Sequence, residues 1–385
     1  MVRADLNVPV QNGKVSDSTR ITRFAAGIKP LLAAGARIVI LSHFGRPKGA
    51  PDPAFSIAPV ADVLADALDQ KVLFAPDCVG ESTVAAAKSL AAGEVMLCEN
   101  LRFHKGEESN DADFAAELAK LGEIYVNDAF SVAHRAHAST AAIANYLPAF
   151  AGPLMAEEIA ALEAALEKPA RPAVAVVGGA KVSSKIAVLK NLVSKVDAIV
   201  VGGGMANTFM LADGYTVGAS LSEADQVPVV HEIQALAKAT GCKIILPEDI
   251  VCADAFAANA AHITTDLDGC PYGAMILDAG PKSVEVISDV FAASKTILWN
   301  GPMGAFEMEP FDKATVALAR KAAALTSAGT VVSVAGGGDT VAALNQAEVS
   351  DQFTYVSSAG GAFLEWLEGK DLPAIAALRT ATPTN

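Results

Sequence analysis

Short runs of β-branched and other apolar residues alternate with helical segments along the whole chain, and this alternation is the feature that most restricts its fold. The runs in the first half are 36–41, 94–97 and 122–126. Those in the second half are 173–177, 198–201, 243–246, 296–299 and 330–334. Strands separated by helices build βαβ units with parallel pairing. The sequence therefore predicts an α/β fold made of parallel sheets.

The length of the chain predicts two domains, because 385 residues exceed the size of one ordinary hydrophobic core. Met155, Ile159 and Leu162 recur at helical spacing, and Pro169 and Pro172 end that pattern before the next apolar run. We expect this helix to connect the domains. The predicted parts are a first domain over 1–153, a connecting hinge helix over 154–168, a second domain over 169–365 and a tail over 366–385 that packs back toward the first domain.

Charge and hydropathy argue against two classes of protein. The formal net charge of -14 disfavours nucleic acid as a partner, because a phosphate backbone requires an excess of Lys and Arg. The apolar stretch 138–156 is broken by Asn145, Pro148 and Pro153, and the first residues form no apolar signal region. We therefore expect no membrane association and a cytoplasmic location.

The cysteines are odd in number and widely spaced. They are Cys78, Cys98, Cys242, Cys252 and Cys270. Because no CxxC pair occurs, their spacing favours neither a zinc site nor a disulfide framework. We expect buried free thiols in a reducing compartment.

Polar and cationic residues follow the apolar runs of the first half. They lie in the segments 42–46, 99–104 and 127–137, and the turn 5–7 and Arg20 belong to the same set. Ligands of open parallel sheets bind beyond the carboxyl ends of the strands. Taken singly, each residue is better explained as a solvated arginine or a hydrogen-bonded core histidine. Several arginines in such positions, however, favour a site that grips a small acid with phosphate and carboxylate groups.

Glycine-rich turns follow the runs of the second half, at 177–181, 201–204 and 335–340. Glycine lets backbone N–H groups approach phosphate oxygens, and a helix N-terminus adds a favourable dipole. One such turn is weak evidence, since tight turns use glycine anyway, but three in one domain favour a nucleotide site. The chain has no GxxxxGK[ST] loop, no GxGxxG after a strand and no protein-kinase landmarks.

The motifs at these turns together resemble the phosphoglycerate kinase family over essentially the whole chain. They are RADLNVP (3–9), SHFGRP (42–47), ENLRFH (99–104), NDAFSVAHRAH (127–137), GGAKVSSK (178–185), GGGMANTF (202–209), WNGPMGAFE (299–307) and GGGDT (336–340). Their number, order and spacing make the resemblance specific. It implies two Rossmann-like domains, each a parallel sheet flanked by helices, joined by a connecting helix with a deep cleft between the domains.

The resemblance also implies an activity and its residues. The activity is the reversible, Mg²⁺-dependent transfer of a phosphoryl group between 1,3-bisphosphoglycerate plus ADP and 3-phosphoglycerate plus ATP, a step of glycolysis carried out by a monomer. The residues expected to hold the phosphoglycerate are Asp5, Asn7, Arg20, His43, Arg46, Arg102 and Arg135. Those expected to serve the nucleotide and the transferring group are Lys181, Lys185, Gly202, Gly203, Asn300, Glu307, Gly337, Gly338, Asp339 and Thr340.

The acceptor of this reaction is a carboxylate that is already ionised at neutral pH, so the chemistry requires cations and no general base. We assign the catalytic work to Arg20, Lys181 and Lys185, together with Mg²⁺. Asp339 is the expected metal ligand, and a helix N-cap is the other common role of a carboxylate at a glycine turn.

Substrates held on different domains react only after the domains close, and the 154–168 helix is the expected hinge. Glu307 is expected to accept a hydrogen bond from a ribose hydroxyl.

The chain departs from the family pattern at a few places. The family usually has several more residues before Arg3, so the first strand is expected to be shortened. Ser131 replaces a small residue, usually glycine, and Ile276 stands where a glycine near the adenine is common. The turn 357–361 is less rich in glycine than usual, which weakens the expectation of a phosphate contact there.

Two other functions stay open. A kinase for acetate or aspartate would share the second domain, but the arginine-rich first half favours an acid that itself carries a phosphate. A nucleotide-binding scaffold without turnover tends to lose its catalytic cations or metal carboxylate. All four of those residues are present, namely Arg20, Lys181, Lys185 and Asp339.

Overall fold

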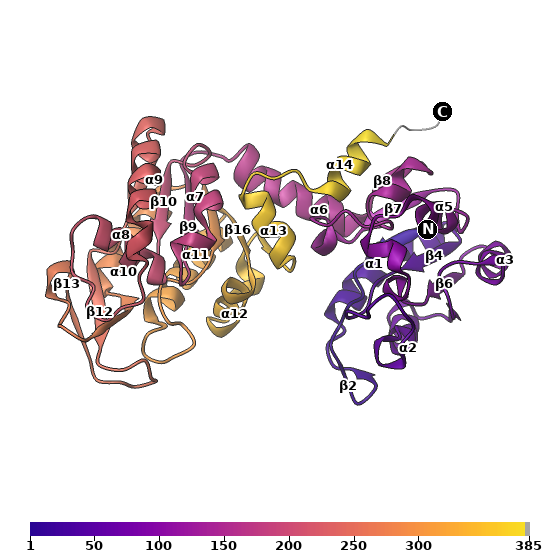
Figure 1. Cartoon of the computed structure of the whole chain (residues 1–385), viewed down its shortest axis with the longest axis horizontal. Helices are drawn as coiled ribbons and strands as arrows, with labels where there is room; N and C mark the ends of the chain where they lie inside the picture. Colours follow the sequence, from indigo (N-terminus) through magenta and orange to yellow (C-terminus); the bar gives the residue numbers. More distant parts are fainter. Residues whose placement is uncertain (382–385) are drawn as a thin grey trace. The chain divides into compact units, whose positions relative to one another are not determined.

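The computed structural model describes residues 1–381 and divides the chain into two compact units (Figure 1). The first unit is Met1–Ile159 with the segment that begins at Asp371, and the second is Ala160–Lys370. The division falls within the predicted connecting helix. There, α6 (Pro153–Leu162) continues into a π-helical segment, η5 (Glu163–Glu167).

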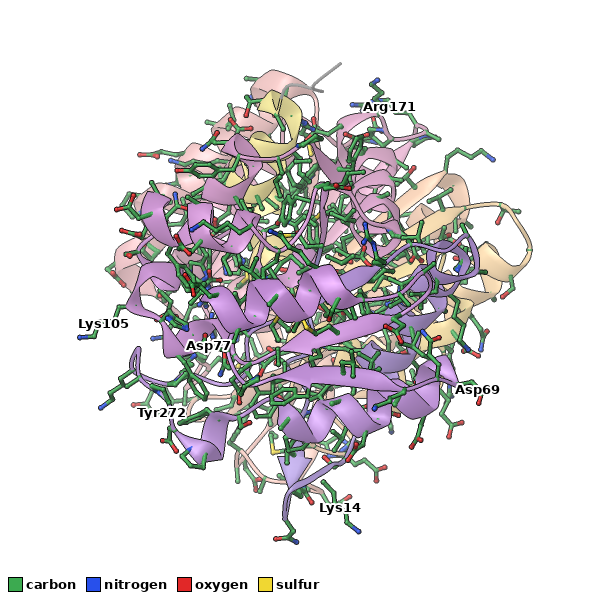
Figure 2. All side chains as sticks on the ribbon, turned by 90° about the vertical axis from the view of Figure 1, so that its right-hand side faces the viewer. Lys14, Asp69, Asp77, Lys105, Arg171 and Tyr272 are labelled. Carbon is green, nitrogen blue, oxygen red and sulfur yellow. The ribbon has the colours of Figure 1, made fainter. Side chains whose placement is uncertain are left out.

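A parallel sheet with the strand order β5-β6-β4-β1-β7-β8 forms the centre of the first unit. Its strands are β1 (Val2–Ala4), β4 (Ile38–Leu41), β5 (Val72–Ala75), β6 (Val95–Cys98), β7 (Tyr125–Asp128) and β8 (Ala149–Ala151). The helices of this unit besides α6 are α1 (Thr19–Ala33), α2 (Ala58–Leu68), α3 (Glu81–Ser89), α4 (Lys105–Glu108), α5 (Ala112–Ala119) and α14 (Pro373–Thr380). A hairpin of β2 (Val10–Gln11) and β3 (Lys14–Val15) projects from it, and Lys14 points away from the unit (Figure 2).

Both faces of this sheet are buried. Ile38 and Ile40 of β4 pack in the core that contains α1 and α2, whereas Val39 and Leu41 pack in the core that contains α3 and α5. A strand that is covered on both faces needs apolar residues at every position. This requirement explains why the runs that predicted the strands show no polar alternation.

A second parallel sheet, in the order β11-β10-β9-β15-β16-β17, forms the centre of the second unit. Its strands are β9 (Ala173–Val177), β10 (Ala198–Val201), β11 (Lys243–Ile245), β15 (Thr296–Asn300), β16 (Val332–Gly336) and β17 (Tyr355–Ser357). The helices are α7 (Ile186–Leu192), α8 (Gly203–Ala212), α9 (Val227–Thr240), α10 (Pro281–Ala293), α11 (Lys313–Ser327), α12 (Gly338–Gln346) and α13 (Gly360–Leu367). A small antiparallel sheet adds β12 (Asp249–Ala253), β13 (His262–Asp266) and β14 (Met275–Ala279) in the order β13-β12-β14.

The predicted parallel α/β architecture is confirmed, but the structure has several strands that the apolar runs do not predict. The runs 173–177 and 198–201 coincide with β9 and β10, whereas β7 begins only at Tyr125, after an irregular segment with a bend at 123–124. The apolar runs did not identify β2, β3, β5, β8, β17 or the antiparallel sheet of β12, β13 and β14, whereas the first strand, β1, is short as expected. β1 has only three residues, and most residues of β13 are exposed, so neither carries an apolar run.

The segment after α13 packs on the first unit through α14, where Ala374 N donates to Ala133 O at 3.1 Å. The last residues of the predicted tail, 382–385, lie outside the described residues. Within residues 1–381, no helix combines the length and the apolar character that crossing a membrane requires. All the cysteines are free, as expected, and all but the half-buried Cys270 are buried.

Candidate active site

Most of the residues predicted to bind the acid follow strands of the first unit. Asp5 follows β1, His43 follows β4, Arg102 follows β6 and Arg135 follows β7. These strands are neighbours in the order β6-β4-β1-β7, and parallel strands bring their carboxyl ends to one edge. The sheet order thus places four separate motifs at one edge.

Asp5 holds Arg20 in place. Arg20 Nη1 donates to Asp5 Oδ2 at 2.8 Å and to Asn7 O at 3.1 Å. Ser131 Oγ donates to the same Oδ2 at 2.5 Å, so the residue that departs from the family pattern supplies an extra hydroxyl to this carboxylate. The Arg20 side chain remains 38% exposed, which leaves its other N–H groups open to solvent or a ligand. Asp5 therefore positions Arg20.

Asn7 connects this pair to the loop after β4. Its Oδ1 accepts from Gly45 N at 2.9 Å, and Gly45 O accepts from Arg102 Nη1 at 2.7 Å. Gly45 has a φ of +59°, a backbone conformation that residues with a Cβ rarely adopt. A Cβ added to Gly45 would lie 2.3 Å from the Phe55 ring. Arg46 follows in this loop with an exposed side chain. Asn7 thus shapes the loop through the backbone.

His43 has a defined tautomer. Arg3 Nη2 lies 3.0 Å from His43 Nδ1, and a guanidinium has only donors, so Nδ1 accepts this hydrogen bond. A neutral His43 then carries its proton on Nε2 and can donate from that atom. Burial lowers the pKa of His43 well below its usual value, and the nearby charges of Arg3, Arg102 and Arg135 lower it further. The ring is therefore neutral at neutral pH.

His137 lies near the same positively charged arginines as His43. Burial lowers its pKa to about 4, with further lowering by Arg102, Arg3 and Arg135. Three guanidinium groups thus act on two buried neutral imidazoles, and this arrangement favours an anionic ligand.

Arg3 and His137 are not among the residues predicted to hold the phosphoglycerate, although His137 lies in the polar segment 127–137. Arg3 is fully buried in β1, where it donates through Nε to Ser139 Oγ at 2.9 Å. An arginine inside a three-residue central strand is unusual, because charged residues are rarely buried without partners. That position was the signal that could have identified it.

In the second unit, Lys185 is enclosed by oxygen atoms. Its Nζ donates to Gly178 O at 2.8 Å, Asn300 O at 3.0 Å and Asn300 Oδ1 at 2.5 Å. Burial lowers the pKa of Lys185 to about 8, while the charge of Asp339 raises it. Lys181, by contrast, is exposed at the start of a short 3₁₀ turn. Of the two predicted catalytic lysines, Lys185 is thus held in place by hydrogen bonds, whereas Lys181 lies at the surface.

The Asn300 side chain extends this arrangement to the start of α12. Asn300 Nδ2 donates to Gly336 O at 2.7 Å, and Gly301 N donates to Thr340 Oγ1 at 2.7 Å. Gly337 has φ +98°, and an added Cβ would lie 2.7 Å from Asn300 Nδ2. Glycine is therefore required at this turn.

The N-terminus of α12 offers backbone donors. Val341 N donates to Gly337 O at 2.9 Å, so the amides of Gly338, Asp339 and Thr340 precede the intrahelical hydrogen bonds. These amides and the helix dipole favour an anion. The helix N-cap is Gly337, so the alternative interpretation of Asp339 as the N-cap is wrong. Asp339 lies instead in the first turn with its side chain exposed.

A cavity of about 280 Å³ lies beside these turns, and Gly203, Glu307 and Asp339 line it. Most of its other lining is apolar, including Ile276 at the position that departs from the family pattern. Asp278 also lines it, and burial raises the pKa of this carboxyl to about 8. Such a cavity, apolar on most sides and ending at a helix N-terminus, suits a base and its phosphates.

The amides of Gly202 and Gly203 are already used within the protein. Gly202 N donates to Val177 O at 3.0 Å, and Gly203 N donates to Met303 O at 2.8 Å. A Cβ on Gly203 would lie 2.8 Å from Gly179 O, so the glycine permits close packing of two turns. The glycines of this turn are predicted to approach phosphate, and for Gly202 and Gly203 that role stays a prediction, while both glycines allow close packing here.

Comparisons with known proteins agree with this geometry. A family model described as phosphoglycerate kinase matches residues 1–370. The phosphoglycerate kinase of Rhizobium meliloti (strain 1021) is 57% identical over 379 residues, which cover 98% of this chain and 95% of the relative. That of Ruegeria sp. (strain TM1040) is 57% identical over 380 residues, with 99% and 96% covered.

Solved structures agree as well. The structure of phosphoglycerate kinase from Coxiella burnetii matches with a TM-score of 0.92 and 44% identity, covering 98% of this chain and 95% of that one. The phosphoglycerate kinase from Pyrococcus horikoshii OT3 matches with a TM-score of 0.78 and 30% identity, covering 99% and 95%. The motifs, the two parallel sheets and these matches lead to one conclusion: the chain belongs to the phosphoglycerate kinase family.

Proposed function

We propose that this chain catalyses the reversible transfer of a phosphoryl group between 1,3-bisphosphoglycerate plus ADP and 3-phosphoglycerate plus ATP. As a member of its family it is a kinase, a transferase of glycolysis. The observation that carries the proposal is that the two units contain different binding sites. One buries guanidinium groups around neutral histidines, and the other places a lysine beside a cavity and a helix N-terminus.

The first unit holds the acid in this proposal. Arg102 and Arg135 grip its phosphate, and His43 donates from Nε2 because Arg3 occupies Nδ1. Arg46 extends the grip from the exposed side of the loop. Asp5 and Asn7 act indirectly, by holding Arg20 and Gly45.

The second unit holds the nucleotide. The amides of Gly338 and Thr340 at the start of α12 bind phosphate oxygens, and Glu307 accepts from a ribose hydroxyl at the cavity wall. The Asn300 side chain accepts a hydrogen bond from Lys185 and donates one to Gly336 O, and it thereby connects the lysine to the turn at Gly337. Gly202 and Gly203 allow the neighbouring turns to pack closely beside the cavity.

The chemistry is electrostatic. The attacking carboxylate is ionised, so no base is needed, and the difficulty is the approach of two anions. Arg20, Lys181 and Lys185 provide positive charge to the transferring group, as guanidinium and ammonium groups do in phosphoryl transfer. The two reacting atoms must come within about 3 Å of each other. We therefore propose that the two domains close on each other by bending at the 154–168 helix.

Mg²⁺ fits the second unit as a companion of the nucleotide. Mg²⁺ takes oxygen ligands and usually one or two carboxylates together with substrate phosphates. Asp339 offers an exposed carboxylate at the cavity, in the first turn of the helix whose N-terminus would receive the phosphates. When bound, the ion neutralises charge on the phosphates.

Oligomeric state, location and partners are part of the proposed function. The chain works as a monomer in the cytoplasm, its partners are the two small-molecule substrates, and nucleic acid is not among them. The net charge of -14 supports the last point.

A coupled assay with MgATP and either 3-phosphoglycerate, acetate or aspartate tests the activity. We expect turnover with 3-phosphoglycerate alone. Turnover with acetate or aspartate instead would replace the proposed substrate, and no turnover with any of the three would favour a binding scaffold.

A further inference from the structure

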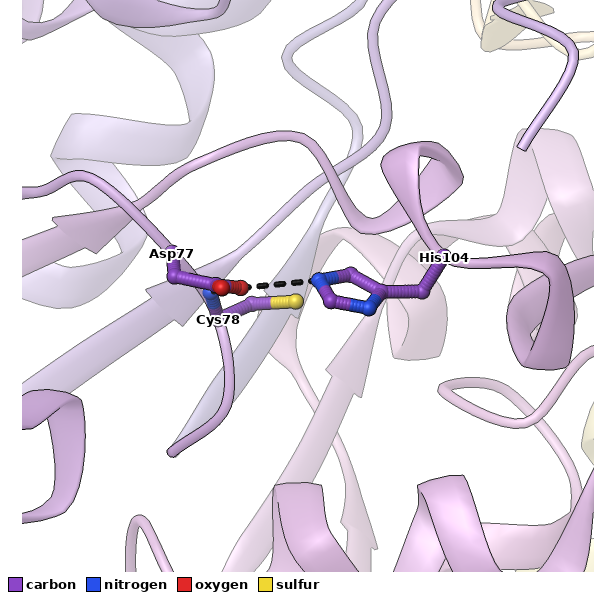
Figure 3. Close-up of side chains that lie close together, drawn as sticks. All are labelled: Asp77, Cys78 and His104. Carbon is purple, nitrogen blue, oxygen red and sulfur yellow. Dashed lines mark hydrogen bonds and ion pairs between the residues drawn. The ribbon is translucent and has the colours of Figure 1, made fainter. Parts of the chain in front are cut away.

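His104 has no role in the proposed function, and it lies in a cluster with two neighbours of different chemistry. Its Nε2 lies 2.8 Å from Asp77 Oδ1. One ligand atom each of Asp77, Cys78 and His104 lies within 4.8 Å of the other two. Figure 3 shows the three side chains together. Carboxylate, thiol and imidazole side chains thus face one point.

The sheet order produces this cluster. Asp77 and Cys78 follow β5, and His104 follows β6 and the short turn η2 (Leu101–Phe103). Because β5 and β6 are neighbouring parallel strands, their carboxyl ends lie together. The cluster therefore lies at the outer end of the edge that carries the acid-binding residues.

We propose that Asp77, Cys78 and His104 bind a divalent cation of the zinc type, with one coordination position left for water or a small ligand. Zn²⁺ combines thiolate, imidazole and carboxylate ligands in tetrahedral sites, and three protein ligands leave a fourth position open. Mg²⁺ and Ca²⁺ take oxygen ligands and do not suit a thiol and an imidazole. This inference does not depend on the proposed phosphoryl transfer.

The distances suit such an ion after small movements. Zinc bond lengths imply ligand atoms roughly 3.3–3.7 Å apart. The hydrogen bond between His104 and Asp77 is the metal-free arrangement, in which a proton occupies the place of the cation. Binding would widen this pair by about 0.5 Å and draw Cys78 Sγ inward.

The ligands are held by neighbouring groups. Asp77 Oδ1 accepts from Cys78 N at 2.6 Å and from Val79 N at 3.3 Å, which fixes the carboxylate on its loop. The His104 ring stacks on Phe114 with 5.1 Å between ring centres and 25° between planes. Supporting contacts of this kind orient metal ligands.

A cavity gives access to two of the three side chains, Asp77 and His104. It has a volume of about 520 Å³, and both Asp77 and His104 line it. Asp52 and Glu99 line it too, and its lining residues, all within the described part of the chain, include neither Lys nor Arg. Lys105 follows His104, but its side chain projects outward (Figure 2). Negative charge around the opening favours entry of a cation.

Cobalt(II) is a suitable probe, because it replaces zinc in such sites and gives a thiolate-to-metal absorption band. We would titrate the purified full-length chain with Co²⁺ in the presence of excess Mg²⁺. We expect the band to saturate at one equivalent and to disappear when Zn²⁺ is added. Absence of the band would overturn the proposal.

Variants identify the ligands. Cys78→Ala should abolish the band, and Asp77→Asn and His104→Gln should weaken binding by at least the 10- to 100-fold that loss of a supporting residue costs. Cys98→Ala, which removes another buried thiol of the same unit, is the matched control and should keep the band.

Cys78 is 1% exposed, so its replacement could impair folding, whereas Asp77 and His104 are partly exposed and tolerate substitution better. If the Cys78 variant does not fold, the other two variants decide the question. Binding with unchanged affinity in both of them would place the metal elsewhere and contradict the proposal.

Discussion

Lys185 Nζ lies 2.5 Å from Asn300 Oδ1, although the two residues are 115 positions apart in the chain. With Gly178 O and Asn300 O, this oxygen completes a set of acceptors that matches the donors of an ammonium group. The lysine is therefore held at the end of β15 before any ligand binds. A phosphoryl oxygen that reaches Lys185 must exchange with one of these protein oxygens.

Replacing Lys185 with Met should lower kcat by on the order of 100-fold or more, because the transferring group loses a preorganised cation. Arg20→Ala should cause a comparable loss. Steady-state kinetics of the coupled reaction measure both. Lys190→Met, which removes an exposed lysine paired with Glu232, is the control and should leave kcat unchanged. Near-normal turnover of either active-site variant would remove that residue from the proposed mechanism.

The rate should fall at alkaline pH. Burial lowers the pKa of Lys185 to about 8, so the free enzyme loses this positive charge as the pH rises through 8. We expect kcat/KM for the nucleotide to decline above that pH, since this quantity reports ionisations of the free enzyme. In Lys185→Arg the decline should vanish from the measured range, because guanidinium stays charged. If kcat/KM of this variant still declines at alkaline pH, the decline is caused by a group other than Lys185.

Arg46→Ala should raise the KM for 3-phosphoglycerate with little change in the KM for ATP. The reason is that Arg46 lies in the loop that Asn7 and Arg102 hold, at the edge proposed for the acid. Lys14→Ala removes an exposed cation from the hairpin of β2 and β3 and serves as the control. If KM for the acid does not change in Arg46→Ala, this loop is not part of the acid site.

Gly178→Ala should destabilise the second unit by roughly 3 kcal/mol or more, the range of severe packing defects. An added Cβ would lie 1.8 Å from Pro302 O, a backbone atom that cannot move alone. Gly360→Ala is the matched control, because no atom lies within 4 Å of its added Cβ and α13 begins there. Denaturant unfolding followed by Trp fluorescence measures both. Equal stability of the two variants would show that the turn at Gly178 relaxes easily.

The first unit should lose stability in mild acid. Burial lowers the pKa of His137 to about 4, so between pH 6.5 and 4 the unfolded chain binds a proton that the folded chain does not. The contribution of neutral His137 to the free energy of unfolding is therefore complete above pH 6.5 and is lost as the pH falls toward 4. Each unit of difference between the folded and unfolded pKa corresponds to about 1.4 kcal/mol.

His137→Gln should weaken that loss, as measured by urea unfolding at pH 7 and pH 5. His231→Gln, at an exposed position of the second unit, should behave as the parent chain does. A parallel pH dependence in His137→Gln and the parent would mean that His137 titrates normally.

The sequence by itself determined the class of fold and the position of most motifs. The runs at 173–177 and 198–201 coincide with β9 and β10, because a strand covered on both faces must be apolar at each position, and this is a local property. The glycine run 336–338 likewise marks a turn by its composition, and Gly337 within it has positive φ. Strands without such runs, β1 among them, left no local signal.

Only the tertiary structure decided which side chains meet. The βαβ pattern does not specify the strand order, and that order puts Arg3 against His43 and Asp77 beside His104. It also decided that the amide of Gly203 is spent on Met303 O while those at the start of α12 precede the helical hydrogen bonds. Such contacts join residues that are far apart along the chain, and their formation depends on packing of whole elements, which no local pattern of residues records.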